Sequence, residues 1–230
     1  MNLLIKCFQS SVEVKAVIFD MDGVITNTMP DHYKAWKTIL KREGINAGYH
    51  DIYSREGQRG IDSVKEIFKS HNKTVSDREA SRILKDKEKY FNGIVKTRFI
   101  PGARNFLKEL RESSSRLALV TGTARHEVRK ILPDNLYHLF SVIITGSDVQ
   151  NGKPHPEPYL KALKELRLRA REAVVVENAP FGIASAKKAG LRCLALETSL
   201  AKIYLREADA VFSSFKELRN KIKFSDSHAI

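Results

Sequence analysis

Two aspartates that are two positions apart, Asp20 and Asp22, directly follow a short apolar run. An unbroken apolar run that ends at a turn residue, here Gly23, is typical of a buried strand in a parallel sheet. Open α/β sheets place their ligand sites at the carboxyl ends of such strands. Two neighbouring carboxylates repel each other unless a cation or a shared proton lies between them, and Mg²⁺ prefers oxygen ligands. The pair therefore predicts a Mg²⁺ site, and the alternative is an acidic pair in an ordinary turn.

A second apolar run, residues 117–120, ends in Thr121, Gly122 and Thr123. A hydroxyl group with adjacent backbone N–H groups, at a turn from a strand to a helix, provides what an anion needs for binding. The three residues therefore predict a contact with a phosphate or a similar group. The alternative is that Thr121 only caps the helix that follows.

A lysine, Lys153, stands among the clustered prolines of residues 151–159. Prolines near the start of a helix fix the backbone there, so this segment would hold the lysine in one place. Next to Asp20, the lysine would lower the pKa of that carboxyl group and screen it from the charge of a phosphate. The alternative is a solvated surface lysine.

Apolar runs that predict strands recur along the chain, and helical patterns separate most of them. The strands are expected at residues 17–20, 116–121, 141–145, 173–177, 193–196 and, more weakly, 210–212, and the helices at 103–113, 157–168 and 181–189. Strands that alternate with helices predict right-handed βαβ units and a doubly wound parallel sheet. The predicted fold class is therefore α/β.

Residues 29–98 interrupt this alternation, because they show helical periodicity without a convincing buried strand. We predict that residues 1–30 and 99–230 form the α/β core and that residues 31–98 form a small all-helical cap domain over the strand ends. A leading extension before the first strand has no predicted role. The tail from Phe224 to Ile230 is expected to be frayed.

Four segments of the chain resemble, in order, the four motifs of the haloacid dehalogenase (HAD) superfamily. They are residues 17–28, 117–123, 151–159 and 174–190. The resemblance implies a Rossmann-like HAD core, in which Asp20 is a nucleophile that becomes a phospho-aspartate and Asp22 is a general acid/base. It also implies that Thr121 donates a hydrogen bond to the transferring phosphoryl group and that Lys153 lies beside the nucleophile.

The resemblance also implies a Mg²⁺ cofactor. Its ligands would be Asp20, the backbone carbonyl of Asp22, and Asn178. The family commonly has an acidic residue where Asn178 stands, so this site keeps an oxygen ligand but loses one negative charge. Two alternatives stay open for Glu177, which would either bind the metal directly or lie behind the direct ligands.

An all-helical insert after the first motif is similar to the cap of the β-phosphoglucomutase-like and phosphoglycolate phosphatase-like branch. In the mutases, the histidine that matches His32 helps to orient the acid/base and the substrate, and Thr28 would lie at the hinge and bind Asp22 when the cap opens. The guanidinium fork of Arg55 suits a distal phosphate. A packing histidine and a surface arginine are the alternatives. The Ser-Arg and Ser-Leu pattern of mutase caps is absent, which argues against a sugar mutase.

The composition of the 230 residues, 42% hydrophobic and 29% charged, is typical of a soluble globular protein. No apolar run approaches the roughly 20 residues that a membrane span requires. The apolar run at the start of the sequence is too short and too interrupted for a signal peptide. Cys7 and Cys193 give neither a disulfide framework nor a metal-binding spacing. We therefore predict a cytoplasmic protein without a membrane partner.

The net charge of +13 is spread over the chain. A solvated basic surface explains it, attraction of phosphorylated substrates comes next, and nucleic-acid binding is not expected because no binding motif accompanies the charge. We expect a small phosphorylated metabolite as the partner and a monomer or weak dimer.

The predicted function is Mg²⁺-dependent hydrolysis of a small phosphate monoester, such as a phosphorylated sugar, through a phospho-aspartate. A phosphomutase of the β-phosphoglucomutase type is the main alternative, since it would transfer the phosphoryl group to a second hydroxyl instead of to water. A basic interaction protein on a retained HAD scaffold is a third possibility, against which the intact set of catalytic residues argues.

Overall fold

The computed structural model describes residues 11–113 and 115–225. Its largest element is a sheet of six parallel strands in the order β4-β3-β2-β5-β6-β7. The strands are β2 (Ala16–Phe19), β3 (Arg116–Val120), β4 (Val142–Ile144), β5 (Ala173–Glu177), β6 (Arg192–Leu196) and β7 (Ala210–Phe212). This is the doubly wound parallel sheet that the sequence predicts, and every predicted strand is present.

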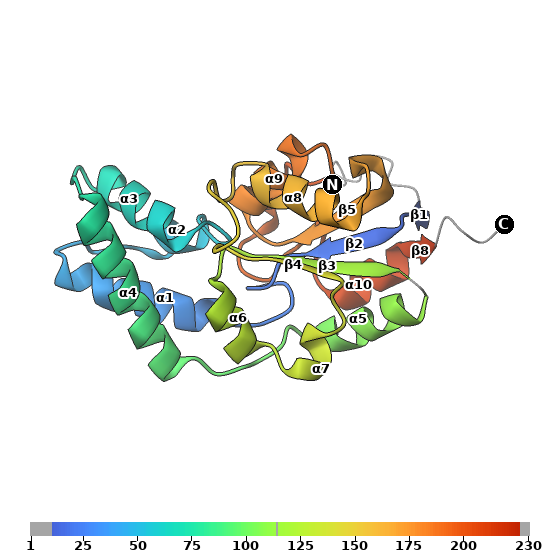
Figure 1. Cartoon of the computed structure of the whole chain (residues 1–230), viewed down its shortest axis with the longest axis horizontal. Coiled ribbons are helices and arrows are strands. Elements are labelled where there is room, and N and C mark those ends of the chain that lie inside the picture. The colour runs from blue at the N-terminus through green and yellow to red at the C-terminus, as the bar shows by residue number, and fades with distance from the viewer. Residues whose placement is uncertain (1–10, 114, 226–230) are drawn as a thin grey trace.

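Helices cover both faces of the sheet (Figure 1). One face is covered by α5 (Ala103–Glu112), α6 (Arg125–Ile131), α7 (Asp134–Tyr137) and α10 (Phe215–Lys221), and the other by α8 (Glu157–Leu166) and α9 (Pro180–Lys188). Two short 3₁₀ helices, η1 (Ala170–Glu172) and η2 (Lys202–Leu205), lie in the connections. Because both faces are buried, the strands are unbroken apolar runs rather than alternating ones.

The register of the sheet determines where the polar side chains emerge. Within β2, Val17 and Phe19 belong to the apolar cluster that includes α5 and α10, whereas the alternate residues belong to the cluster with α8 and α9. Phe19 pairs with Leu119 on one side and with Val176 on the other. The residues that follow these three therefore leave the sheet at the same edge.

Four helices lie between β2 and α5 and to one side of the sheet (Figure 1). They are α1 (Met29–Arg42), α2 (Tyr49–Tyr53), α3 (Gly60–Ser70) and α4 (Asp77–Ile94). They share an apolar cluster of their own, which includes Trp36 and Phe68. Helix α4 begins with a capping box between Ser76 and Glu79. We call residues 29–94 the helical insert; that it forms a separate cap domain with the predicted boundaries stays a prediction.

The predicted frayed tail is wrong at its start. Residues of β8 (Lys223–Ser225) pair in parallel with β1 (Ser11–Glu13) and form a second, two-stranded sheet. The ring of Phe224 packs 5.6 Å from that of Phe106, so an apolar contact orders this strand. Residues 1–10, with Cys7 and most of the leading extension, and residues 226–230 lie outside the described part of the chain.

The second cysteine, Cys193, is fully buried in β6 and has a free thiol. Among the helices of residues 11–113 and 115–225, none combines the length and the apolar character that a membrane crossing requires. The cytoplasmic location and the oligomeric state stay predictions.

Candidate active site

Three ion-paired side chains lie at the edge of the sheet where the parallel strands have their carboxyl ends. The Lys153 ammonium group donates to Asp20 Oδ1 at 2.7 Å and to Glu177 Oε1 at 2.7 Å, and it also bonds to the carbonyl of Val120 at 3.0 Å. Asp20, Lys153 and Glu177 are each 1% exposed. The structure thus brings together three residues that the sequence predicts for the site, although they come from three separate segments.

Burial controls the charge of these three side chains. Burial raises the pKa of Asp20 and Lys153 lowers it, while Glu177 and Asp22 add to the effect of burial, so the net pKa is about 8. Lys153 lowers the pKa as predicted, but burial outweighs the lysine. Burial lowers the pKa of Lys153, but the charges and hydrogen bonds of Asp20 and Glu177 together outweigh burial. The net pKa of Lys153 therefore lies above its usual value. A divalent cation beside Asp20 would favour its ionised form.

The loop before α8 positions Lys153. Pro156 and Pro158 flank the first residue of α8, and Tyr159 is fully buried below them. The Ser185 hydroxyl of α9 donates to the carbonyl of His155 at 2.6 Å. These contacts restrain the loop at both ends, as the cluster of prolines predicts.

Both carboxylate oxygens of Glu177 are engaged. Oε1 accepts from Lys153 and from the Tyr159 hydroxyl at 2.9 Å, and Oε2 accepts from the backbone N–H groups of the next two residues at 2.9 and 3.3 Å. Gly182 of α9 lies so close to this carboxylate that any side chain there would collide with it. A metal could bind Glu177 only by replacing one of these bonds, so the geometry favours a role in holding Lys153.

Hydroxyl groups surround Asp22, the other residue of the aspartate pair. Thr28 donates to Asp22 Oδ1, Thr123 donates to Oδ2 at 2.7 Å, and Thr121 contacts the same oxygen at 3.4 Å. The Nε2 atom of His32 lies 3.4 Å from Oδ1. Four residues that the sequence analysis singled out therefore converge on one carboxylate.

These neighbours keep Asp22 ionised. Burial raises the pKa of Asp22, but His32 and the hydroxyl groups of Thr28 and Thr123 lower it more, to about 2. The charge of His32 contributes only when the imidazole is protonated. Burial and the charge of Lys87 lower the pKa of His32, so at pH 7 the contacts of Asp22 with the neutral imidazole and with the two hydroxyl groups keep the pKa of Asp22 low. In this conformation Asp22 is a carboxylate that can accept a proton.

The bond between Thr28 and Asp22 corrects one expectation. The resemblance ties this bond to an open cap, but here it is present while Glu56 of the helical insert contacts Asn178 of the core at 2.8 Å. Thr28 lies directly before α1, and its hydroxyl oxygen is 3.1 Å from the hydroxyl oxygen of Thr26, which is fully buried. The bond therefore does not require the insert to move away from the core.

The turn after β3 is compact. Thr121 Oγ1 accepts a hydrogen bond from the backbone N–H of Thr123 at 3.1 Å, and α6 begins only at Arg125, without a side-chain cap. The alternative role of Thr121 as a helix cap is thus not observed. Gly122 lies against the backbone carbonyl of Gly57 in the helical insert, which leaves no room for a side chain.

The helical insert contributes His32 and a buried lysine that sequence analysis missed. His32 Nδ1 lies 2.9 Å from Lys87 Nζ, and its ring stacks on Phe91 with centroids 4.0 Å apart. His32 therefore both packs and faces Asp22. The sequence signal for Lys87 is its place on the buried face of α4, four residues after Ile83 and four before Phe91, where a lysine is unusual.

Three buried oxygen atoms at this edge have no hydrogen-bond partner in the described part of the chain: Asp20 Oδ2, Asn178 Oδ1 and Glu56 Oε2. Buried polar atoms are almost always paired, so these three mark a place for a group that the described residues do not supply. Carboxylate and amide oxygens fit Mg²⁺. The described residues contain no group of three or more His, Cys, Asp or Glu suited to a metal, so a site here depends on Asn178. Sequence analysis missed Glu56, which has no motif around it.

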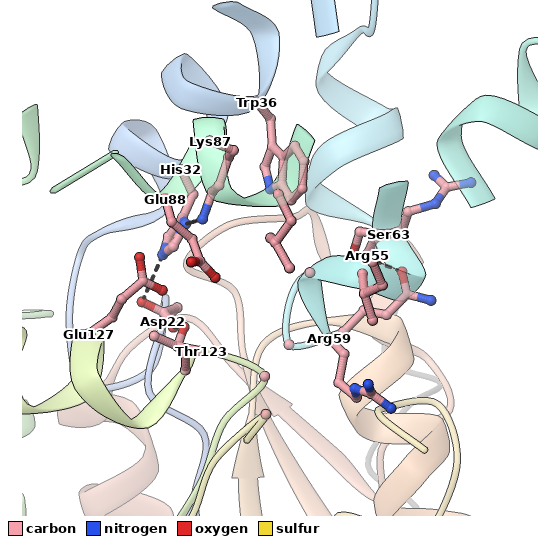
Figure 2. A pocket seen from close by; sticks show the side chains of 18 of the residues that line it. Asp22, His32, Trp36, Arg55, Arg59, Ser63, Lys87, Glu88, Thr123 and Glu127 are labelled. Atoms are coloured by element: carbon pink, nitrogen blue, oxygen red, sulfur yellow. Dashed lines mark hydrogen bonds and ion pairs between the residues drawn. The ribbon is translucent and has the colours of Figure 1, made fainter. Parts of the chain in front are cut away.

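A cavity of about 420 Å³ lies between Asp22 and the helical insert (Figure 2). Trp36 and Lys87 line it from the insert, and Glu127 lines it from α6. Asp20 is not among the lining residues. A Cβ at Gly57 would be 3.6 Å from Asp20 Oδ1, so the backbone of the insert covers this aspartate.

Arg55 lines the same cavity as Asp22 and His32, but its guanidinium group makes no contact with them. Its side chain extends away from Asp22 in Figure 2, its Nη1 donates to the carbonyl of Asp51 at 2.8 Å, and its Nε lies 3.6 Å from a carboxylate oxygen of Glu66. A role for Arg55 in phosphate binding stays a prediction, and it requires these contacts to break.

Residues 17–196 match the model of a family described as haloacid dehalogenase-like hydrolase. The match covers the strands that position Asp20, Thr121 and Glu177, and also the loop of Lys153. The chain belongs to the haloacid dehalogenase-like hydrolase family. Its parallel sheet, with these residues at the carboxyl ends of neighbouring strands, agrees with the fold that the resemblance implied.

Several of the similar named proteins are phosphatases. Validoxylamine A 7'-phosphate phosphatase of Streptomyces hygroscopicus subsp. limoneus is 28% identical over 208 residues, which are 89% of this chain and 96% of that protein. Phosphorylated carbohydrates phosphatase of Thermotoga maritima is 30% identical over 185 residues, 77% of this chain and 82% of that protein. These relatives support an enzyme of the HAD phosphatase type.

A similar solved structure comes from Bacteroides vulgatus and is named provisionally as a β-phosphoglucomutase. It has a TM-score of 0.80 and 32% sequence identity, and the match covers 91% of this chain and 88% of that chain. A β-phosphoglucomutase from Clostridium difficile has a TM-score of 0.78 and 25% identity over 90% of this chain and 96% of that chain. The HAD core described above is therefore shared with proteins named as phosphatases and with proteins named as mutases.

Proposed function

We propose that this protein is a Mg²⁺-dependent phosphatase that cleaves a small phosphate monoester through a phospho-aspartate on Asp20. The position of Asp20 supports the proposal most strongly. It follows β2, an inner strand of the six-stranded parallel sheet, and pairs with Lys153 at 2.7 Å, while its Oδ2 is buried and has no hydrogen-bond partner among the described residues. The phosphatases among the relatives support the same class of reaction.

In the proposed first step, Asp20 attacks the phosphorus atom in line with the leaving alcohol. Lys153 neutralises charge beside the nucleophile, and the Thr121 hydroxyl donates to an equatorial oxygen of the phosphoryl group. When bound, Mg²⁺ supplies positive charge that screens the nucleophile from the phosphate. Asp20, Asn178 and the backbone carbonyl of Asp22 would hold the ion.

Asp22 would protonate the leaving alcohol and then deprotonate the water that hydrolyses the phospho-aspartate. Its ionised state, stabilised by bonds from Thr28 and Thr123, suits the second of these roles. The first role requires a proton on Asp22. Loss of one hydroxyl bond when a substrate binds would raise the pKa of Asp22 and so favour that proton.

We propose that the helical insert is a movable cap. The backbone around Gly57 covers Asp20 in this structure, so a phosphate reaches the nucleophile only when the insert moves. Opening would admit the substrate, and closure would exclude bulk water from the reaction.

The cavity next to Asp22 suits a small leaving group. Its volume of about 420 Å³ and its mixed lining, with the aromatic ring of Trp36 beside the charges of Lys87 and Glu127, fit a phosphorylated sugar or a related metabolite. The net charge of +13 would attract such an anion.

A phosphomutase is the second candidate, because similar solved structures are named as β-phosphoglucomutases. A mutase must protect its phospho-aspartate from water and grip a second phosphate. Arg55, the cap residue best suited to that grip, is engaged with Asp51. With β-glucose 1-phosphate and a bisphosphate primer, we expect net phosphate release and slow or absent isomerisation. Rapid formation of glucose 6-phosphate with little free phosphate would favour the mutase instead.

The proposed function is tested with a panel of phosphorylated sugars and related metabolites. We expect release of inorganic phosphate from at least one of them, which stops when EDTA removes the metal and returns when Mg²⁺ is added in excess. Release that is unaffected by EDTA would contradict the role of Mg²⁺. No release from any compound would contradict the phosphatase and favour an interaction protein on this scaffold.

A further inference from the structure

Glu56 is a buried carboxylate that forms no ion pair with any described residue. It lies in the loop between α2 and α3 of the helical insert and is only 4% exposed. Within the described residues, Oε1 accepts from Asn178 Nδ2 at 2.8 Å and from Ser199 Oγ at 3.3 Å, and Oε2 has no hydrogen-bond partner. A carboxylate buried in this way is strongly unfavourable unless a cation or a proton compensates its charge.

The surroundings of Glu56 are negative. A Cβ on Gly23, the residue after Asp22, would lie 2.3 Å from Glu56 Oε1, and a Cβ on Gly57, the residue after Glu56, would lie 3.6 Å from Asp20 Oδ1. An acidic side chain from the insert thus lies next to the aspartates of the core. Repulsion of this kind points to a cation that binds between them.

The backbone on both sides is shaped to allow this approach. Gly57 has a φ of 78°, and a Cβ there would be 3.0 Å from Lys153 Cδ. Gly23, directly after Asp22, has a φ of 84°, and a Cβ there would collide with Glu56 Oε1 and with the amide nitrogen of Asn178. Positive φ values favour glycine, and the absence of both side chains lets the Glu56 carboxylate reach the aspartate pair.

We propose that Glu56 is a ligand of the Mg²⁺ site, carried by the helical insert, and that it supplies the negative charge that Asn178 lacks. The inference rests on the proposed function, which brings Mg²⁺ to Asp20. The three unpartnered oxygens, one each from Asp20, Asn178 and Glu56, then share one partner. The Asn178 amide group fits this arrangement, because its nitrogen donates to Glu56 and its oxygen stays free for the metal.

A ligand on the insert links metal binding to closure. Asp20 belongs to the core and Glu56 to the insert, so Mg²⁺ binds more tightly when the two parts are in contact. By thermodynamic reciprocity, bound Mg²⁺ favours that contact by the same factor. The nucleophile is then enclosed preferentially in the metal-loaded enzyme.

Calorimetric titration of the full chain with Mg²⁺ tests the proposal. The set comprises the wild type, Glu56→Gln, Asn178→Asp and the double variant, with Asp86→Asn as the control. Asp86 is a carboxylate of the insert that forms an exposed pair with Arg82. We expect Glu56→Gln to weaken Mg²⁺ binding at least about tenfold. Asp86→Asn should have no effect, and Asn178→Asp should recover much of the affinity in the Glu56→Gln background.

Trp36 provides a second readout, because it is the single tryptophan of the chain and lines the cavity from the insert. We expect Mg²⁺ to change its fluorescence in the wild type and in Asp86→Asn, and to have little effect in Glu56→Gln. A fluorescence change of the same size in Glu56→Gln would contradict the link between the metal and closure.

Equal Mg²⁺ affinity in the wild type and in Glu56→Gln would overturn the inference and leave the proposed function intact. Tighter binding by Glu56→Gln would also overturn it, since the carboxylate would then block the site rather than bind the metal. If the wild type does not bind Mg²⁺ at all, the proposed function fails as well.

Discussion

Two buried lysines, Lys153 of the core and Lys87 of the helical insert, differ in whether they form an ion pair with a carboxylate. Lys153 of the core lies between Asp20 and Glu177, whose charges raise its pKa above the usual value despite burial. Lys87 of the helical insert bonds to a nitrogen of His32, and its ammonium group lies 4.7 Å from the centre of the Phe91 ring. Burial lowers the pKa of Lys87.

The difference separates two kinds of site. In the core, the charge of Lys153 is compensated by carboxylates of the protein itself, so the group is fixed before any ligand arrives. In the insert, Lys87 and Glu56 are buried and form no ion pair within residues 11–113 and 115–225, although the charge of Glu127 acts on Lys87. We therefore expect the core to determine the reaction, and the insert to determine which metal state and which substrate the enzyme accepts.

The largest effect is expected from Asp20→Asn. The amide cannot accept the phosphoryl group, so phosphate release should fall by at least about 10³-fold. The melting temperature should not fall, because the change relieves repulsion with Asp22 and leaves Lys153 paired with Glu177. Phosphate release and thermal unfolding of the purified variant provide the measurements. Unchanged turnover would show that the reaction does not depend on the core aspartate.

Lys153→Met breaks the compensated group of the core. It leaves Asp20 and Glu177 buried without their cation, which should lower the free energy of unfolding by about 3–5 kcal/mol. Urea denaturation measures the loss, and Lys164→Met, at an exposed position of the same α8 region, is the control and should stay within about 0.5 kcal/mol of the wild type. Equal stability of both variants would mean that the core charges are not coupled.

The apparent affinity for Mg²⁺ should rise with pH. Without metal, burial raises the pKa of Asp20 to about 8, so at lower pH a proton must leave before the ion binds. The affinity should therefore increase by up to about tenfold per pH unit below pH 8 and level off above it. Calorimetry on metal-stripped protein between pH 6.5 and 9 measures this. A flat profile would mean that Asp20 is already ionised at the lower pH.

Lys87→Met should have the smallest effect on stability, within about 1 kcal/mol in either direction, because Lys87 forms no ion pair within the described residues and Glu127 feels its charge only at a distance. Its charge lowers the pKa of His32, so that pKa should rise in the variant. NMR titration of the imidazole measures the shift, with the exposed Lys89→Met of the same helix as the control. A loss of stability as large as that of Lys153→Met would remove the contrast between the two lysines.

The core part of the site could be predicted from the sequence for a physical reason. Asp20, Thr121 and Glu177 each end an apolar run of strand type, and the carboxyl ends of parallel strands meet at one edge whatever the details of packing. Lys153 comes from a loop, but the prolines around it restrict where it can point. The sequence could not decide whether Glu177 binds the metal directly, because that depends on the hydrogen bonds of its carboxylate, which no sequence pattern specifies.

The contribution of the insert could not be predicted in the same way. Where Glu56 lies depends on how four helices pack against one another and against the core, and its neighbours in sequence show no periodicity that points to Asn178. Arg55, one position earlier, has a side chain suited to binding a phosphate, but its guanidinium group points away from Asp22 and donates to the carbonyl of Asp51. Only Lys87 left a local signal, as a charged residue on an apolar face of a helix.

Trapping the phosphoryl group tests whether Asp20 is the nucleophile. The enzyme is mixed with Mg²⁺ and a substrate from the panel, quenched during turnover and treated with borohydride, which reduces an aspartyl phosphate to homoserine. Peptide mass spectrometry then locates the change. We predict homoserine at position 20 in the wild type and none in Asp20→Asn. Homoserine at another aspartate, or unmodified protein while phosphate is being released, would contradict a phospho-aspartate on Asp20.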